Sequence, residues 1–168
     1  MASRGSAIPL FVSQIKENKP ITITDPKMTR FLMSLEESVK LVFYAFSKGQ
    51  QGDILVQKSP SSTILDLAKA LQIIFERKNN IKIIGTRHGE KAHETLVNRE
   101  EMIRAISSSK YYRIPADNRS LNFNKYFVSG DKKITSVKDY TSANTKILTI
   151  KEIIKKLKTL KFIKENIL

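Results

Sequence analysis

The sequence predicts an α/β fold, with α+β as the alternative, in which short strands alternate with amphipathic helices. Runs of β-branched residues recur between helical segments, and Pro, Gly, Asn and Asp separate the two kinds of segment. In the helical segments the apolar residues recur at i, i+3, i+4 and i+7. With 168 residues, 40% of them hydrophobic, the chain is long enough for one core and too short for two full domains. We expect about five helices by the count of periodic segments.

A first helix is expected over residues 7–18, with Ser6 as its N-cap. Pro20 follows it, and residues 21–24 (Ile-Thr-Ile-Thr) alternate β-branched side chains as a short strand. The apolar face of this helix comprises Ile8, Phe11, Val12 and Ile15.

A second helix opens at the capping box of residues 34–37 (Ser-Leu-Glu-Glu) and stops at Gly49 and Gly52. Its apolar residues share one face, which predicts a stripe buried in the core. The stripe consists of Val39, Val42, Phe43 and Phe46.

Strands are expected at residues 53–57 and 81–84, where compact apolar runs are flanked by breakers. Between them, residues 59–62 form a loop and cap, and a third helix runs from Ile64 to near Arg77. The charged turn after the second of these strands is expected to open into a helix that extends to about residue 106.

That turn, residues 85–94 (Gly-Thr-Arg-His-Gly-Glu-Lys-Ala-His-Glu), has the composition of an anion-binding loop. Arg87 can contact a phosphate through two donors, and Gly89 allows close approach of the backbone. Glu90 can accept from sugar hydroxyls and is expected in the first turn of the following helix. An ordinary surface loop is the alternative for the turn taken alone.

The C-terminal region is less regular. Residues 111–115 predict a short strand, residues 121–140 are mixed polar and aromatic, and a last helix is expected from Thr149 to about residue 165. We therefore divide the chain into a main portion, residues 1–148, and an amphipathic basic helix, residues 149–168. The apolar stripe of that helix comprises Ile150, Ile153, Ile154, Leu157 and Leu160.

The composition favours some classes of function and excludes others. Thirty Lys and Arg against 16 Asp and Glu give a net charge of +14, which favours anionic partners, although lysines scattered over solvent faces are the alternative. The absence of Cys excludes disulfides and thiolate chemistry, and two histidines, His88 and His93, argue against a zinc centre. No apolar run is long enough to span a membrane, so we expect a cytoplasmic protein.

Five segments occur in the order and spacing of a known family. They are residues 1–11 (Met-Ala-Ser-Arg-Gly-Ser-Ala-Ile-Pro-Leu-Phe), 21–31 (Ile-Thr-Ile-Thr-Asp-Pro-Lys-Met-Thr-Arg-Phe), 66–69 (Asp-Leu-Ala-Lys), 85–94 and 139–145 (Asp-Tyr-Thr-Ser-Ala-Asn-Thr). Together they resemble the C-terminal half of the CapD/CapE-type polysaccharide-biosynthesis enzymes. These are extended short-chain dehydrogenases with a Rossmann-like fold that act on UDP-sugars, as UDP-glucose 4-epimerases or as UDP-N-acetylglucosamine 4,6-dehydratases and epimerases.

The resemblance implies roles for four residues. Arg30 and Arg87 match positions that the family uses on the UDP pyrophosphate, and Glu90 matches a ribose-hydroxyl acceptor. Arg4 lies in the loop that helps to enclose the nucleotide. Lys91, next to Glu90, can help to neutralise phosphate, and a surface lysine without a specific role is the alternative. The sequence departs from the family at residue 88, where His replaces the usual Pro and makes the turn less rigid.

The resemblance also implies what the chain lacks. In the family, the Gly-rich NAD(P) loop and the catalytic Tyr-x-x-x-Lys pair lie upstream of the Ser-Arg-Gly-Ser loop. Tyr44 and Lys48 reproduce that spacing, but on a helix whose stripe we expect in the core. We therefore expect a UDP-sugar-binding half that is incomplete and inactive by itself and binds no cofactor alone. It would be a truncated product, an excised domain or a partner of a separate N-terminal Rossmann-domain polypeptide, and a homo-oligomer is compatible with the sequence.

The alternative function is that of a small basic protein that binds nucleic acid through its C-terminal lysines. This alternative predicts a steep salt dependence of the affinity for DNA or RNA. Aromatic residues make up only 8% of the chain and are not interleaved with the lysines, so we rank it second.

Overall fold

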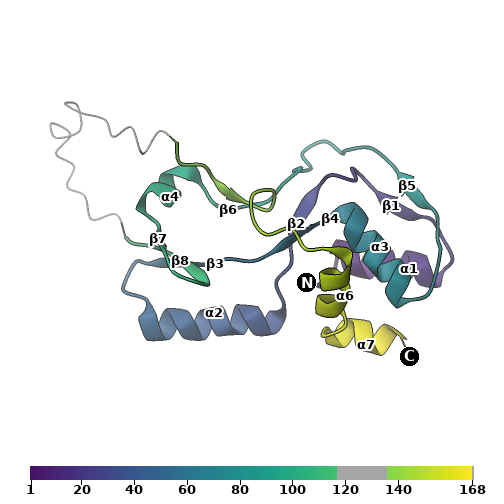
Figure 1. Ribbon diagram of the computed structural model, residues 1–168, viewed down its shortest axis with the longest axis horizontal. Helices are drawn as coiled ribbons and strands as arrows, with labels where there is room; N and C mark the ends of the chain where they lie inside the picture. Colours follow the sequence, from purple (N-terminus) through teal and green to yellow (C-terminus); the bar gives the residue numbers. More distant parts are fainter. Residues whose placement is uncertain (117–135, 168) are drawn as a thin grey trace. The chain divides into compact units, whose positions relative to one another are not determined.

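The computed structural model describes residues 1–116 and 136–167, which divide into two compact units. Of the described residues, the first unit comprises 1–36, 59–94 and 142–167, and the second comprises 37–58, 95–116 and 136–141. Both units mix helices and strands, as the alternating pattern in the sequence predicts (Figure 1).

The first unit contains short strands covered by helices. Its elements are α1 (Ala7–Lys16), β1 (Ile21–Ile23), β2 (Thr29–Phe31), β4 (Ser61–Thr63), α3 (Ile64–Ile74), β5 (Ile81–Ile83), α6 (Ile150–Leu157) and α7 (Lys161–Ile167). Strand β1 pairs in parallel with β5, and β2 pairs antiparallel with β4. A parallel pair needs a long crossover connection, and α3 is the last element before β5 in the one between these strands.

One hydrophobic core holds the first unit together. Helix α1 buries the face that was predicted for it, and α3 packs against α6. Helix α3 begins at Thr63, whose side chain accepts a hydrogen bond from the backbone N–H of Asp66. The core residues of α3 and α6 that are buried most completely are Ala68, Ala70, Leu71, Ile153 and Leu157.

In its described residues, the second unit has a three-stranded antiparallel sheet and a separate strand pair. Its elements are α2 (Leu35–Lys48, which begins in the first unit), β3 (Ile54–Gln57), β6 (Thr95–Val97), α4 (Arg99–Arg104), β7 (Ile106–Ser107), β8 (Tyr111–Ile114) and β9 (Tyr140–Thr141). The sheet has the order β3-β8-β7, and β6 pairs with β9. The strand predicted at residues 111–115 is therefore confirmed.

The sequence predicts that the apolar stripe of α2 is buried in the core, but the structure does not place it there. The helix is present over Leu35–Lys48, yet none of its residues is buried. The prediction was wrong because periodicity identifies an apolar face without identifying what covers it. Tyr44 stacks on Tyr111, with ring centroids 4.1 Å apart.

The prediction of a helix directly after the charged turn is also wrong. Residues 85–94 form turns and coil, the chain continues as β6, and the helix that follows, α4, has only six residues. Thr95 to Val97 favour a strand, and the helix starts only at the capping box of Asn98 and Glu101. Glu90 is therefore not in a helical first turn.

The last helix is broken in two. Helix α6 ends at Leu157, and α7 begins at Lys161. The hydroxyl of Thr159 donates to the carbonyl of Lys156 at 2.8 Å, which competes with continuation of the helix, and Leu160 is buried at the corner. Both helices belong to the first compact unit. Of the mixed segment 121–140, residues 121–135 lie outside the described residues.

Candidate functional site

A hollow of about 530 Å³ in the first unit collects most of the residues that the sequence singled out. Its wall is formed by the N-terminal loop, α1, the β1 and β2 strands, α3 and the charged turn. Apolar side chains line its inner part, and they are Ile23, Phe11, Leu32, Ile64 and Leu67. Its polar rim carries hydroxyls, two guanidiniums and one carboxylate, a composition that suits a ligand with an anionic part and an uncharged part.

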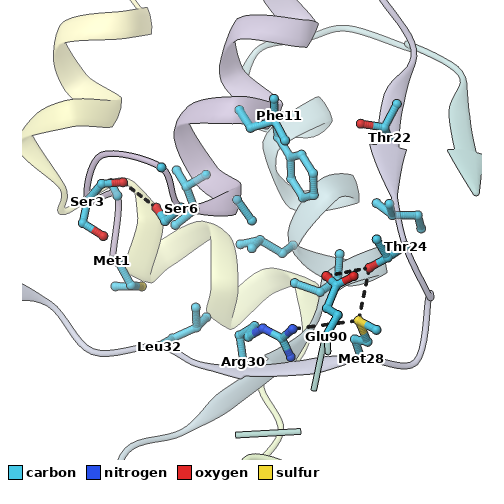
Figure 2. Close-up of a pocket in the computed structure, with 18 of the residues that line it drawn as sticks. Met1, Ser3, Ser6, Phe11, Thr22, Thr24, Met28, Arg30, Leu32 and Glu90 are labelled. Carbon is cyan, nitrogen blue, oxygen red and sulfur yellow. Dashed lines mark hydrogen bonds between the residues drawn. The ribbon is translucent and has the colours of Figure 1, made fainter. Parts of the chain in front are cut away.

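The N-terminal loop and the start of α1 border this hollow. Gly5 has a positive φ of 79°, and the loop closes through a hydrogen bond from Ser6 N to Ser3 O at 3.1 Å. The Ser6 hydroxyl also donates to Ser3 O, at 2.8 Å, so it does not cap α1 (Figure 2). Pro9, in the first turn, has no N–H. Ser6 and Ala7 line the hollow, which places the positive end of the α1 dipole at its rim.

The charged turn is closed by Glu90. Its backbone N–H donates to Arg87 O at 3.1 Å, and its carboxylate accepts from Arg87 N at 3.3 Å and from the Thr24 hydroxyl at 3.1 Å. Gly89 has a positive φ of 78°, and a Cβ there would meet nothing within 4 Å. This glycine therefore serves the backbone conformation of the turn. The carboxylate retains lone pairs, because each of its oxygens accepts one of these two bonds and can accept a second.

Arg30 connects β2 to the loop that follows the charged turn. Its guanidinium donates to the carbonyls of Thr29 at 2.8 Å, Lys91 at 2.9 Å and Ala92 at 3.3 Å. Its Nε lies 3.5 Å from a carboxylate oxygen of Glu94. Figure 2 shows the Arg30 guanidinium near Met28, on the side of the hollow where Glu90 lies. Arg30 therefore orders the loop while it faces the hollow.

Arg87 contrasts with Arg30. Its residue is exposed and lines the hollow, and its guanidinium has no hydrogen bond or ion pair within residues 1–116 and 136–167. A guanidinium without a partner of its own keeps its donors for an anionic ligand.

The structure brings three of the five predicted site residues together. Arg30, Arg87 and Glu90 line the hollow. Arg4 and Lys91 are exposed and are not part of its lining, although the neighbours of Arg4 in the loop are. The sequence reasoning missed Thr24, which holds Glu90. The alternation of residues 21–24 contained the signal, because Ile21 and Ile23 are buried and the intervening threonines point the other way.

A buried hydroxyl pair supports the rim from behind. Thr29 Oγ1 lies 2.6 Å from Ser142 Oγ and 2.8 Å from Nδ1 of His93. Ser142 Oγ also accepts from the Glu94 N–H at 2.9 Å. His93 therefore orders the loop. No group of three or more His, Cys, Asp or Glu that could hold a metal occurs within the described parts of the chain.

Comparison with known proteins gives a consistent result. A family model described as "Polysaccharide biosynthesis protein" matches residues 1–116, and one described as "Polysaccharide biosynthesis protein C-terminal" matches residues 117–164. The UDP-glucose 4-epimerases of Rickettsia massiliae (strain Mtu5) and Rickettsia bellii (strain OSU 85-389) are 60% and 61% identical to the chain over 167 residues. The match covers 99% of this chain and 49% of each relative, so the chain spans about half the length of these relatives.

A solved structure agrees with this alignment. The X-ray structure of Pen from Bacillus thuringiensis superposes with a TM-score of 0.75 at 28% sequence identity, covering 95% of this chain and 46% of that one. Among the helices of residues 1–116 and 136–167, none is long and apolar enough to cross a membrane.

Proposed function

Because the chain belongs to the polysaccharide biosynthesis protein family and corresponds to the C-terminal half of an epimerase-like enzyme, we propose that its hollow binds a UDP-sugar. The observation that carries the proposal is the position of Arg30 and Arg87. They are far apart in the sequence and come from different elements, yet both line one hollow. Arg87 can bind a phosphate through charge-assisted, bidentate contacts, and the Arg30 guanidinium, whose donors already serve backbone carbonyls, adds positive charge to the same hollow.

In this proposal the predicted residues have different roles in binding the ligand. Arg87 is the direct phosphate contact, because its guanidinium is not used elsewhere in the described residues. Arg30 adds positive charge and holds the loop that follows the turn. Glu90 accepts from a ribose hydroxyl through its remaining lone pairs. Arg4 closes over the nucleotide from the N-terminal loop, and Lys91 contributes long-range attraction.

The sugar would occupy the apolar part of the hollow. Side chains of α1 and α3, such as Phe11 and Leu67, form that part. Nucleotide-sugar ligands combine a charged diphosphate with uncharged rings, and the hollow separates the same two characters. In a reaction of the kind its relatives are named for, the hollow would hold the UDP-sugar while the sugar ring reacts.

The residues of this chain do not fit the NAD(P) of the complete family enzymes. A dinucleotide cradle needs closely spaced glycines in the turn after a parallel strand. The six glycines here contain no Gly-x-Gly, and the turn after β1 carries Asp25 and Pro26. Tyr44 and Lys48, which mimic Tyr-x-x-x-Lys, lie on α2 and do not line the hollow. We propose that the chain supplies substrate binding and that a Rossmann-type half supplies the cofactor.

Calorimetric titration with UDP tests this proposal. We expect UDP to bind the chain and Arg87→Ala to weaken it by roughly 10- to 100-fold, as for the loss of charge-assisted hydrogen bonds. Arg77→Ala is the matched control, because Arg77 is an exposed arginine of the same unit that does not line this hollow. Equal loss in both variants would indicate bulk charge, and tight binding of duplex DNA that is indifferent to Arg87 would favour the nucleic-acid alternative.

A further inference from the structure

The α2 helix exposes a continuous stripe of large apolar side chains. The α2 stripe comprises Val39 (46% exposed), Val42 (53%), Phe43 (69%) and Phe46 (86%). Because successive residues are about 100° apart around a helix, these four residues lie within roughly a third of its circumference. Single exposed apolar residues are ordinary, but a contiguous group of this size marks an interaction surface.

The opposite face of the helix already has its partner. Tyr44 stacks on Tyr111 of β8 at 4.1 Å between ring centroids, and Leu41 and Ala45 on the same side are half-buried. The helix is therefore held in the second unit without the stripe. Its phenylalanines are mostly exposed within the described residues, so their apolar surface is available to a partner.

A strand edge in the same unit points to a missing neighbour as well. Within the described residues, β3 has a ladder partner on one side only, β8, and it is the end strand of its sheet. Ile54 in this strand is 52% exposed. Exposed edges with apolar residues are usually paired or covered in folded proteins.

We propose that the α2 stripe docks the half of the fold that precedes the matched region in the relatives. The relatives are about twice as long as the part that this chain matches, so an equally large folded body accompanies this region in each of them. The stripe carries no charge, and a large uncharged apolar surface suits a permanent partner better than a transient one or a polyanion. The docking proposal does not depend on UDP binding, because no stripe residue lines the hollow.

Co-expression tests it directly. The probe is the part of the Rickettsia bellii relative that precedes its matched region, tagged and co-expressed with this chain. We expect the two to co-purify, and Phe43→Asp with Phe46→Asp to weaken the complex at least about tenfold. Lys40→Asp is the control, since Lys40 is exposed on α2 but outside the stripe. Circular dichroism should show the same helix content in all variants, because none of these side chains is buried.

Hydrogen exchange provides a second readout that does not require the probe to fold alone. When the two halves are joined in one polypeptide in the order of the relatives, residues 39–48 should exchange at least about tenfold more slowly than in the chain alone. Unchanged exchange there would overturn the proposal. So would binding that survives both aspartate substitutions, or a homodimer of the chain that these substitutions dissolve, because a second copy would then be the occupant.

Discussion

Helices α6 and α2 have similar apolar stripes in the sequence and opposite surroundings in the structure. On α6, Ile153 and Leu157 are completely buried against α3 and its neighbours. On α2, Phe43 and Phe46 are mostly exposed. An apolar period fixes which face of a helix avoids water, whereas the partner for that face is a property of the rest of the fold. The difference shows which apolar residues stabilise this chain and which are available to another surface.

The largest expected loss of stability comes from truncating a residue of the α6 stripe, and truncating a residue of the α2 stripe is the comparison. Leu157→Ala should lower the free energy of unfolding by about 2 to 5 kcal/mol, because it leaves a cavity in a core that cannot fully collapse. Phe46→Ala should change it by no more than about 0.5 kcal/mol, although it removes a larger side chain. Denaturant unfolding followed by circular dichroism measures both. A cost for Phe46→Ala as large as that for Leu157→Ala would mean that the α2 stripe is buried within this chain.

The elements that the sequence predicted well are those whose signal is local. The Ile8 to Ile15 face of α1 and the alternation at β1 each lie within one segment, and each is present in the structure. The loop and cap expected at residues 59–62 were wrong in part, because residues 61–63 form β4 and the N-cap of α3 is Thr63. The helix expected after residue 90 failed because an apolar period was extended past β-branched residues and past the Asn98 capping box.

The site could be predicted only in part, for the same reason. Arg30, Arg87 and Glu90 were found through motifs that each lie in one short segment, and the hollow brings them together. The contact between Thr29 and Ser142 joins residues 113 positions apart, and no local pattern encodes it. The Thr24 bond to Glu90 likewise depends on the pairing of β1 with β5. Long-range polar contacts need the fold before they can be identified.

A second comparison concerns hydroxyls. Ser142 is completely buried and bonds to Thr29 and to the Glu94 N–H, whereas Ser47 on α2 is exposed. Ser142→Ala should lower the free energy of unfolding by about 1 to 3 kcal/mol, because it leaves buried polar partners unsatisfied. Ser47→Ala should be within about 0.5 kcal/mol of the unmodified chain. Equal small effects would show that water replaces the Ser142 hydroxyl, and the rim of the hollow would then not depend on it.

The smallest expected effect on stability lies at the start of α6, the helix with the buried stripe, where exposed polar contacts hold its first turn. Lys146 Nζ contacts the Glu152 carboxylate at 2.6 Å, and the backbone and hydroxyl of Thr149 also donate to it. The Lys146 hydrogen bond, followed by those of Thr149, lowers the pKa of Glu152 from 4.5 to about 2. Since the folded pKa is the lower one, the stabilisation is present above the unfolded value of 4.5 and is lost as the pH falls toward about 2.

Glu152→Gln removes that dependence, so the variant should lose less stability than the unmodified chain between about pH 6 and about pH 3. The thermal midpoints of both proteins at the two pH values measure the difference, which should shrink in high salt because the pair is exposed. Lys151→Gln is the control, a charge change on the same helix at an exposed position. Parallel pH curves for Glu152→Gln and the unmodified chain would mean that the capping box persists in the unfolded ensemble or adds nothing to α6, and the burial of its stripe would then be sufficient to hold the helix.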